Sequence, residues 1–182
     1  DWERFGRNQR SNHMRRLCRV YVEFLLGTGI RQGTESMPIR WKSLQWHWIG
    51  EQRYLRIWVS GKTGPRYLIA RAALKATLER LIAWQELPYP TLDAVIQAGL
   101  DRRVFTMPAG DQPYSMQGVF RRLLEDADLL RDPQTCQVRT LYSLRHTYAT
   151  FALAEGIDIH TLARQMGTST LMIERHYSKL TP

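Results

Sequence analysis

Three short segments of the chain carry side chains suited to chemistry on a phosphate group. "GTGIRQGTE" places Arg31 just beyond a glycine that ends a helix, and "SGKTGPR" places Lys62 at the tip of a predicted hairpin. "TLYSLRHTYAT" carries Tyr142 and Arg145, which lie three residues apart and therefore on one face of a helix. Guanidinium and ammonium groups bind phosphate oxygens strongly. Together the segments predict a phosphate site.

Each of these residues also has an ordinary structural interpretation. An arginine after a glycine is usually a solvated surface residue, and a lysine at a hairpin tip usually serves solubility. Arg145 is harder to explain in this way, because it would lie beside an apolar stripe and would need a partner if buried. The residues of that stripe are Leu141, Leu144, Tyr148 and Phe151.

A fourth segment, "MGTSTLMIERHYSKL", carries Tyr177 on a predicted short helix that Thr168 or Ser169 would open. Tyr177 is either a packed aromatic residue or a nucleophile. A tyrosine with its ordinary pKa of about 10 is a poor nucleophile, so it needs help in losing its proton and a strongly positive field. The three cationic segments could supply that field.

Composition narrows the class of protein. The 182 residues carry a formal charge of +9, which favours a polyanionic partner. No run approaches the ~18 apolar residues of a membrane span, and no signal-peptide pattern opens the chain. The chain has two cysteines, Cys18 and Cys136, which are too few for a disulfide framework and so indicate a reducing cytosol. Because the sequence contains no cluster of Cys and His residues, we expect no metal or cofactor site. Because Asp1 is not an initiator methionine, we expect an excised fragment.

Apolar periodicity predicts a mainly helical α+β fold with one small antiparallel sheet near the N-terminal third. We expect residues 1–11 to be a linker or frayed start, and a helix capped by Asn12 to end at the glycines of "GTG". A strand over 54–59 should pair with "YLIA" through the hairpin. Further helices are expected around 74–82, 91–98, 119–124, 141–155, 158–166 and 169–178.

Taken together, "GTGIRQGTE", "LRHTYAT" and "MGTSTLMIERHY" resemble the catalytic domain of tyrosine recombinases, the phage-integrase family. The resemblance runs from about residue 12 to 180, and it implies a catalytic domain over 12–182. The family's pattern is an arginine, a lysine on a β-hairpin, His-x-x-Arg, Gly-His/Trp and a nucleophilic tyrosine. The resemblance therefore implies catalytic roles for Arg31, Lys62, Arg145 and Tyr177.

Two positions depart from this pattern. Tyr142 stands where the family usually has the histidine of His-x-x-Arg, and Thr168 stands where it has histidine or tryptophan. Both hydroxyls can hydrogen-bond a phosphate oxygen, but neither can carry positive charge. The resemblance also suggests that Glu35 is a carboxylate that orients an arginine; the alternative is an acid on a helix surface. His146 and His176 flank catalytic positions and are expected to face packing or solvent.

The resemblance implies a site-specific recombinase or integrase that cleaves and rejoins DNA through a 3′-phosphotyrosyl intermediate, with no metal or cofactor. Its implied partners are double-stranded DNA and other protomers, in a tetramer on paired sites. It also implies a separate N-terminal core-binding domain and a cytoplasmic, bacterial or phage-encoded protein that acts on the nucleoid.

The rivals to this function are DNA-binding modules without cleavage activity. "DIHTLARQMGTSTLMIERHY" also fits a helix-turn-helix reader, and a catalytically degenerate recombinase is a second possibility. A type IB topoisomerase is disfavoured by the short chain and by the "LRHT" context.

Overall fold

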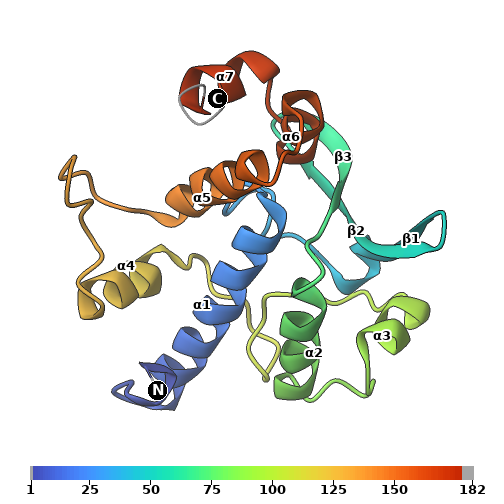
Figure 1. Ribbon diagram of the computed structural model, residues 1–182. Helices are drawn as coiled ribbons and strands as arrows, with labels where there is room; N and C mark the ends of the chain where they lie inside the picture. The colour runs from blue at the N-terminus through green and yellow to red at the C-terminus, as the bar shows by residue number, and fades with distance from the viewer. Residues whose placement is uncertain (1, 178–182) are drawn as a thin grey trace.

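The computed structural model describes residues 2–177, without the side chain of Tyr177. Within this range the chain forms α-helices and one three-stranded sheet (Figure 1). The mainly helical α+β prediction is confirmed. The helices are α1 (Gln9–Thr28), α2 (Leu74–Trp84), α3 (Leu92–Ala98), α4 (Gln117–Asp126), α5 (Leu141–Ala154), α6 (Ile159–Met166) and α7 (Thr170–Tyr177).

The N-cap of α1 lies four residues earlier in the chain than the sequence predicts. The side chain of Asn8 accepts a hydrogen bond from the backbone N–H of Ser11 at 2.8 Å and so caps α1. The prediction that Asn12 is the cap is wrong: its side chain accepts from the backbone N–H of Gly6 at 2.6 Å. The cause is the polar first turn and a half of α1, which shows no apolar period to mark its start.

The end of α1 is confirmed at the predicted glycines. Gly29 has a left-handed backbone (φ +64°), and its N–H donates to the carbonyl of Leu25 at 2.9 Å. A side chain at Gly29 would collide with the ring of Tyr148 on α5. Glycine therefore lets the chain leave α1 directly beneath α5, and Arg31 follows two residues later.

The sheet is antiparallel with the order β1 (Leu44–Ile49), β2 (Gln52–Gly61) and β3 (Gly64–Ile69). Gly61 pairs with Gly64, so Lys62 and Thr63 form a two-residue tip, as the predicted hairpin requires. Every second residue of the central part of β2 is buried, as a strand with one inward face requires. These residues are Leu55, Ile57 and Val59.

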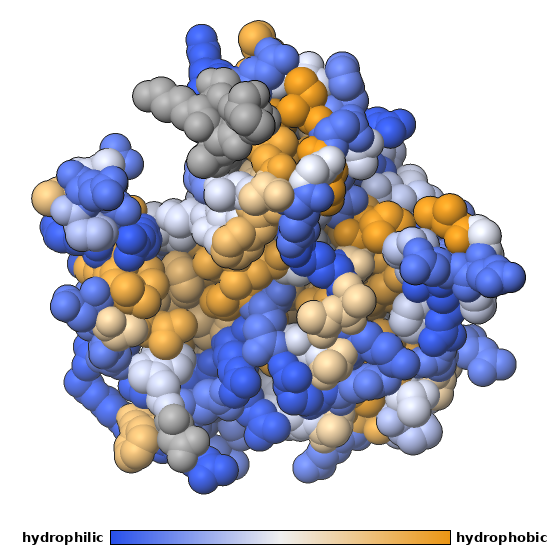
Figure 2. All heavy atoms as spheres, in the orientation of Figure 1, coloured by the Kyte–Doolittle hydropathy of each residue, from blue (hydrophilic) through white to orange (hydrophobic). Residues whose placement is uncertain are grey.

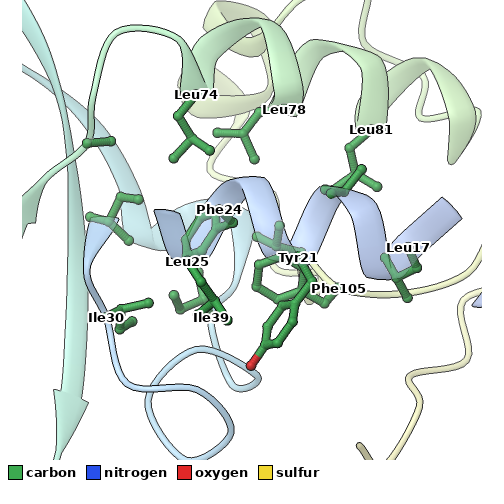
Figure 3. Close-up of a cluster of buried hydrophobic side chains, with 14 of the residues drawn as sticks. Leu17, Tyr21, Phe24, Leu25, Ile30, Ile39, Leu74, Leu78, Leu81 and Phe105 are labelled. Atoms are coloured by element: carbon green, nitrogen blue, oxygen red, sulfur yellow. The ribbon is translucent and has the colours of Figure 1, made fainter. Parts of the chain in front are cut away.

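The main core surrounds α1. Figure 3 shows Leu74, Leu78 and Leu81 of α2 above this helix, with the ring of Phe105 against Tyr21. The Tyr21 and Phe105 rings meet edge to face, with centroids 4.9 Å apart. Burial of these side chains fixes α1, and with it the loop that carries Arg31.

The last three helices form a second, smaller cluster, and α5 crosses the C-terminal part of α1 (Figure 1). The prediction that Phe151 belongs to the apolar stripe of α5 is wrong, because this side chain is 55% exposed. The buried face instead contains two alanines in place of this ring, which lets α6 approach closely. The cluster consists of Tyr148, Ala149, Ala152, Leu162, Ala163, Met166 and Ile173.

The face seen in Figure 2 is mostly hydrophilic over α1 and α2, whereas hydrophobic residues gather along α5 and beside α7. The exposed large hydrophobic residues of these two helices are Tyr142, Phe151, Leu171 and Met172. Between residues 2 and 177, no helix has the length and apolar character needed to cross a membrane.

Candidate active site

Arg145 is a buried cation in the second turn of α5, and only 4% of it is exposed. Its Nη1 donates to the carbonyl of Gly29 and its Nη2 to the carbonyl of Met166, each at 2.6 Å. No ion pair within residues 2–177 includes it. Burial, and then the charge of Arg31, lower the pKa of Arg145 to about 10, so it remains protonated at neutral pH.

Arg31 lies in the loop after α1 and joins three parts of the chain. Its Nη1 donates to Glu35 at 2.7 Å and to the hydroxyl of Thr63, at the hairpin tip, at 3.3 Å. Its Nη2 donates to the carbonyl of Gly167 at 2.5 Å. The structure thus brings the first predicted arginine, the hairpin and the turn between α6 and α7 together.

Glu35 is buried rather than on a surface, with its side chain fully covered. The guanidinium of Arg31 donates to one oxygen of the carboxylate and its backbone N–H to the other at 3.4 Å, and Arg66 donates to both oxygens at 2.8 and 3.2 Å. Burial alone would raise the pKa of Glu35, but the hydrogen bonds from Arg66 and Arg31 outweigh burial and leave it lowered. Glu35 is therefore an ionised carboxylate that holds two arginines in place.

Arg66 was missed by the sequence reasoning, although it lies in the quoted segment "SGKTGPR". Besides Glu35, it donates to the carbonyls of Met166 at 3.2 Å and of Gln165 at 3.4 Å. Strand alternation could have found it, because Arg66 shares a face with buried Leu68. A charge on the inner face of a strand requires a buried partner.

Gln165 on α6 was also missed. Its side-chain oxygen accepts from the backbone N–H of Ile69 at 2.9 Å, and its amide donates to the carbonyl of the same residue at 2.6 Å. These two bonds pair α6 with the end of β3 as a neighbouring strand would. No pattern in the sequence signals this contact.

The end of α6 is the point where the arginines meet. Asp158 caps the start of α6 and Gly167 ends it with a left-handed backbone (φ +62°). The carbonyls at the end of a helix carry its negative partial charge, which favours cations. Arg31, Arg66 and Arg145 all donate to these carbonyls. Only one carboxylate, that of Glu35, pairs with this cluster among the described residues.

Three other predicted residues lie around the cluster without bonding to it. Lys62 is exposed at the hairpin tip and makes no hydrogen bond or ion pair with the described part of the chain. Thr168 is half-buried in the turn after α6, where its N–H donates to the carbonyl of Ala163 at 2.9 Å. Tyr142 is exposed in the first turn of α5, with its ring 5.1 Å from that of His146.

Tyr177 is the last residue of α7, and its side chain lies outside the described part of the structure. The ring of the preceding residue, His176, lies 6.0 Å from that of His146. Burial, then the charges of His176 and Arg145, lower the pKa of His146. His146 is half-buried, and its ring contacts that of Tyr142 edge to face.

Among residues 2–177, no group of three or more His, Cys, Asp or Glu side chains is arranged to hold a metal ion. The charged centre consists of guanidinium groups and one carboxylate. Such a centre can bind and polarise a tetrahedral oxyanion through N–H donors.

Solved structures of recombinases share this architecture. The site-specific recombinase XerH, in a pre-cleavage complex with its difH substrate, matches 90% of the chain with 19% identity and a TM-score of 0.62. The fold is that of the tyrosine recombinases. XerA recombinase matches 97% of the chain (17% identity, TM-score 0.60), and the Tn1549 transposon integrase matches 88% (20% identity, TM-score 0.56).

The chain covers less than two thirds of each of those proteins. The chain spans 44% of the XerH chain, 54% of the Tn1549 integrase chain and 64% of the XerA chain. Neither a protein-family model nor a curated protein sequence matches the chain.

Proposed function

We propose that this chain is the catalytic domain, over residues 12–182, of a tyrosine recombinase that cleaves and rejoins DNA at specific sites. One observation carries the proposal: Arg31, Arg66 and Arg145 meet at the end of α6, where the one carboxylate among the described residues, that of Glu35, pairs with Arg31 and Arg66 but not with Arg145. An uncompensated positive charge in a largely buried site costs free energy. A scissile phosphate is an anion that would compensate it.

Arg31 and Arg145 would hold the non-bridging oxygens of that phosphate. A guanidinium has five N–H donors, and Arg145 spends one on Gly29 and one on Met166. The remaining donors can bind oxygens whose charge grows as the phosphorus becomes pentacoordinate. Interactions that strengthen in the transition state accelerate the reaction.

The phenolic oxygen of Tyr177 would attack the phosphorus, and the bond from phosphorus to the 5′ oxygen would break. The positive field favours the phenolate and so helps Tyr177 to lose its proton. Lys62 would give a proton to the departing 5′ oxygen. The hydroxyls of Tyr142 and Thr168 would hydrogen-bond a phosphate oxygen.

The product of this step is a 3′-phosphotyrosyl bond and a free 5′ hydroxyl. Attack by the 5′ hydroxyl of another strand on the same phosphorus would release Tyr177 and restore a phosphodiester. One phosphate ester is exchanged for another in each direction, so the exchange needs no external energy source.

The similar structures support the choice of substrate. The XerH structure contains a difH substrate, and the Tn1549 integrase structure contains transposon right-end DNA. By this likeness, and from the net charge of +9, we propose double-stranded DNA as the substrate. Recombination would also require further protomers, in a tetramer on paired sites, and a core-binding domain outside this chain.

The decisive experiment is incubation with a nicked suicide DNA substrate, followed by a denaturing gel. We expect a covalent adduct with the wild-type chain and none with Tyr177→Phe, which keeps the ring and removes only the attacking oxygen. DNA affinity should be the same for both. An adduct that survives Tyr177→Phe refutes the assignment of the nucleophile.

Tyr142 and Thr168 favour one alternative, a recombinase-like module that binds DNA without cutting it. Neither hydroxyl can carry the positive charge of a histidine. This alternative predicts DNA binding without an adduct for the wild-type chain, and an adduct once Thr168→His is introduced.

A further inference from the structure

Arg66 contacts two separate parts of the candidate active site at once. On one side it donates to both oxygens of Glu35, and on the other to the carbonyls at the end of α6. A guanidinium is planar and presents its donors in a rigid fork, so it fixes both partners relative to each other. Glu35 in turn holds Arg31.

We propose that Arg66 is a positioning residue, which holds the pair of Glu35 and Arg31 against the end of α6. It thereby fixes the turn that carries Thr168 and opens α7. The kinetic part of this inference rests on the proposed cleavage activity, whereas the structural part does not.

Two glycines show how closely Arg66 and its partner are packed. A side chain at Gly167 would collide with the guanidinium of Arg66, and a side chain at Gly61 would collide with Glu35. The Arg66 side chain is mostly buried between them. Without Arg66, the turn after α6 would lose the contact that fills this space.

A second residue, Gln165, also joins α6 to β3, because its side chain forms hydrogen bonds with the backbone of Ile69. In Figure 1, β3 runs beside α6, and the turn into α7 follows directly. Arg66 and Gln165 therefore tie the strand that follows Lys62 to the helix that precedes Thr168. Through Arg66 the hairpin and the α6–α7 turn keep a fixed relation.

The charge of Glu35 supplies a readout that simple loss of packing would not change. The cations that face this carboxylate are Arg31, Arg66 and, at longer range, Arg145. Burial raises the pKa of Glu35 and the hydrogen bonds from the arginines lower it. Loss of the bonds from Arg66 leaves burial less well compensated, so the pKa of Glu35 should rise. A protonated Glu35 would release Arg31, and cleavage would fail at a higher pH than in the wild-type chain.

The test measures single-turnover adduct formation against pH, at saturating suicide DNA, for Arg66→Gln and Arg66→Lys in the full chain. We expect Arg66→Gln to slow adduct formation on the order of 10²-fold, as misplaced catalytic groups do. Its acid limb should move to higher pH, with DNA affinity unchanged. Arg66→Lys keeps the charge and should recover part of both losses. The matched control is Arg56→Gln, a substitution on the outer face of the same sheet.

A wild-type chain that forms no adduct would refute the proposed function, so a second measurement tests Arg66 alone. We expect Arg66→Gln, unlike Arg56→Gln, to raise the pKa of a ¹³C-labelled Glu35 carboxylate and to speed amide hydrogen exchange over 166–168. Unchanged values of both overturn the inference, whatever the cleavage result. A slower rate with an unmoved acid limb and no recovery in Arg66→Lys also overturns it. Should Arg66→Gln not fold, Arg66→Lys is compared with the wild-type chain by the same criteria.

Discussion

Replacement of Arg145 by methionine tests whether this buried cation serves to bind an anion or to stabilise the folded chain. Methionine preserves most of the side-chain length and removes the charge and both hydrogen bonds, to Gly29 and Met166. Hydrogen bonds to a charged group contribute about 1.5–3 kcal/mol each, so their loss alone would cost about 3–6 kcal/mol.

An opposing term comes from the buried charge itself. Burial, and then the neighbouring charge of Arg31, lower the pKa of Arg145 to about 10. At about 1.4 kcal/mol per pKa unit, the charged form costs on the order of 3 kcal/mol in the folded chain. This penalty is fully present below about pH 10. It decreases as the pH rises above about 10, where the folded chain loses the proton and the unfolded chain still holds it, and it is gone only when the unfolded chain has lost the proton as well. The net loss expected for Arg145→Met is therefore at most about 3 kcal/mol.

The assay compares thermal unfolding of the wild-type chain and Arg145→Met with and without inorganic phosphate. An anion at tenfold excess over its Kd stabilises a folded protein by about 1.4 kcal/mol, and we expect Arg145→Met to lose most of this gain. Arg56→Met, on the outer face of the sheet, should retain it. Two results would refute the reasoning: phosphate stabilisation that persists in Arg145→Met, or a loss of stability clearly above about 3 kcal/mol.

The other predictions concern Lys62, Thr168 and Gly29. Lys62→Ala should cleave a 5′-bridging phosphorothiolate substrate far better than ordinary DNA, because that leaving group needs no proton; equal rates would remove Lys62 as the general acid. Thr168→His should maintain or raise the rate of adduct formation on suicide DNA, and a fall would show that the hydroxyl itself is needed. Gly29→Ala should lower the free energy of unfolding by about 1–3 kcal/mol or more in urea titrations, because it strains a left-handed residue beneath the ring of Tyr148. A neutral result would contradict the packing described at this junction.

The sequence predicted those elements whose signals are local. The hairpin around Lys62 follows from alternation within one strand and a glycine turn, and the end of α1 follows from Gly29. The cap of α1 was misplaced because Asn8 and Asn12 are both residues that favour a cap, and the polar residues between them do not distinguish the two; only Asn8 accepts from an N–H of the helix. Exposure of Phe151 could not be foreseen, because the spacing that predicts a stripe does not say where α6 packs.

The contacts of the candidate site depend on residues far apart in the chain. Arg145 was expected to need a partner, but its acceptors, the carbonyls of Gly29 and Met166, are backbone groups that no sequence pattern marks. Arg66 was missed because its partner, Glu35, lies 31 residues away. Residue types predicted which charges could do chemistry, whereas the tertiary fold determines which of them meet.

The convergence of arginines on the last carbonyls of α6 has a consequence for the timing of activity during synthesis. Arg31, Arg66 and Arg145 all precede α6 and α7 in the chain, so a growing polypeptide carries the cations before it carries their acceptors or Tyr177. Domains generally fold as units once their segments are available. On the proposed function, a chain that is still being made, or one cut before α6, would lack both the carbonyls that position its arginines and the tyrosine that attacks the phosphate. On that proposal, an unfinished molecule could not leave a DNA strand covalently trapped.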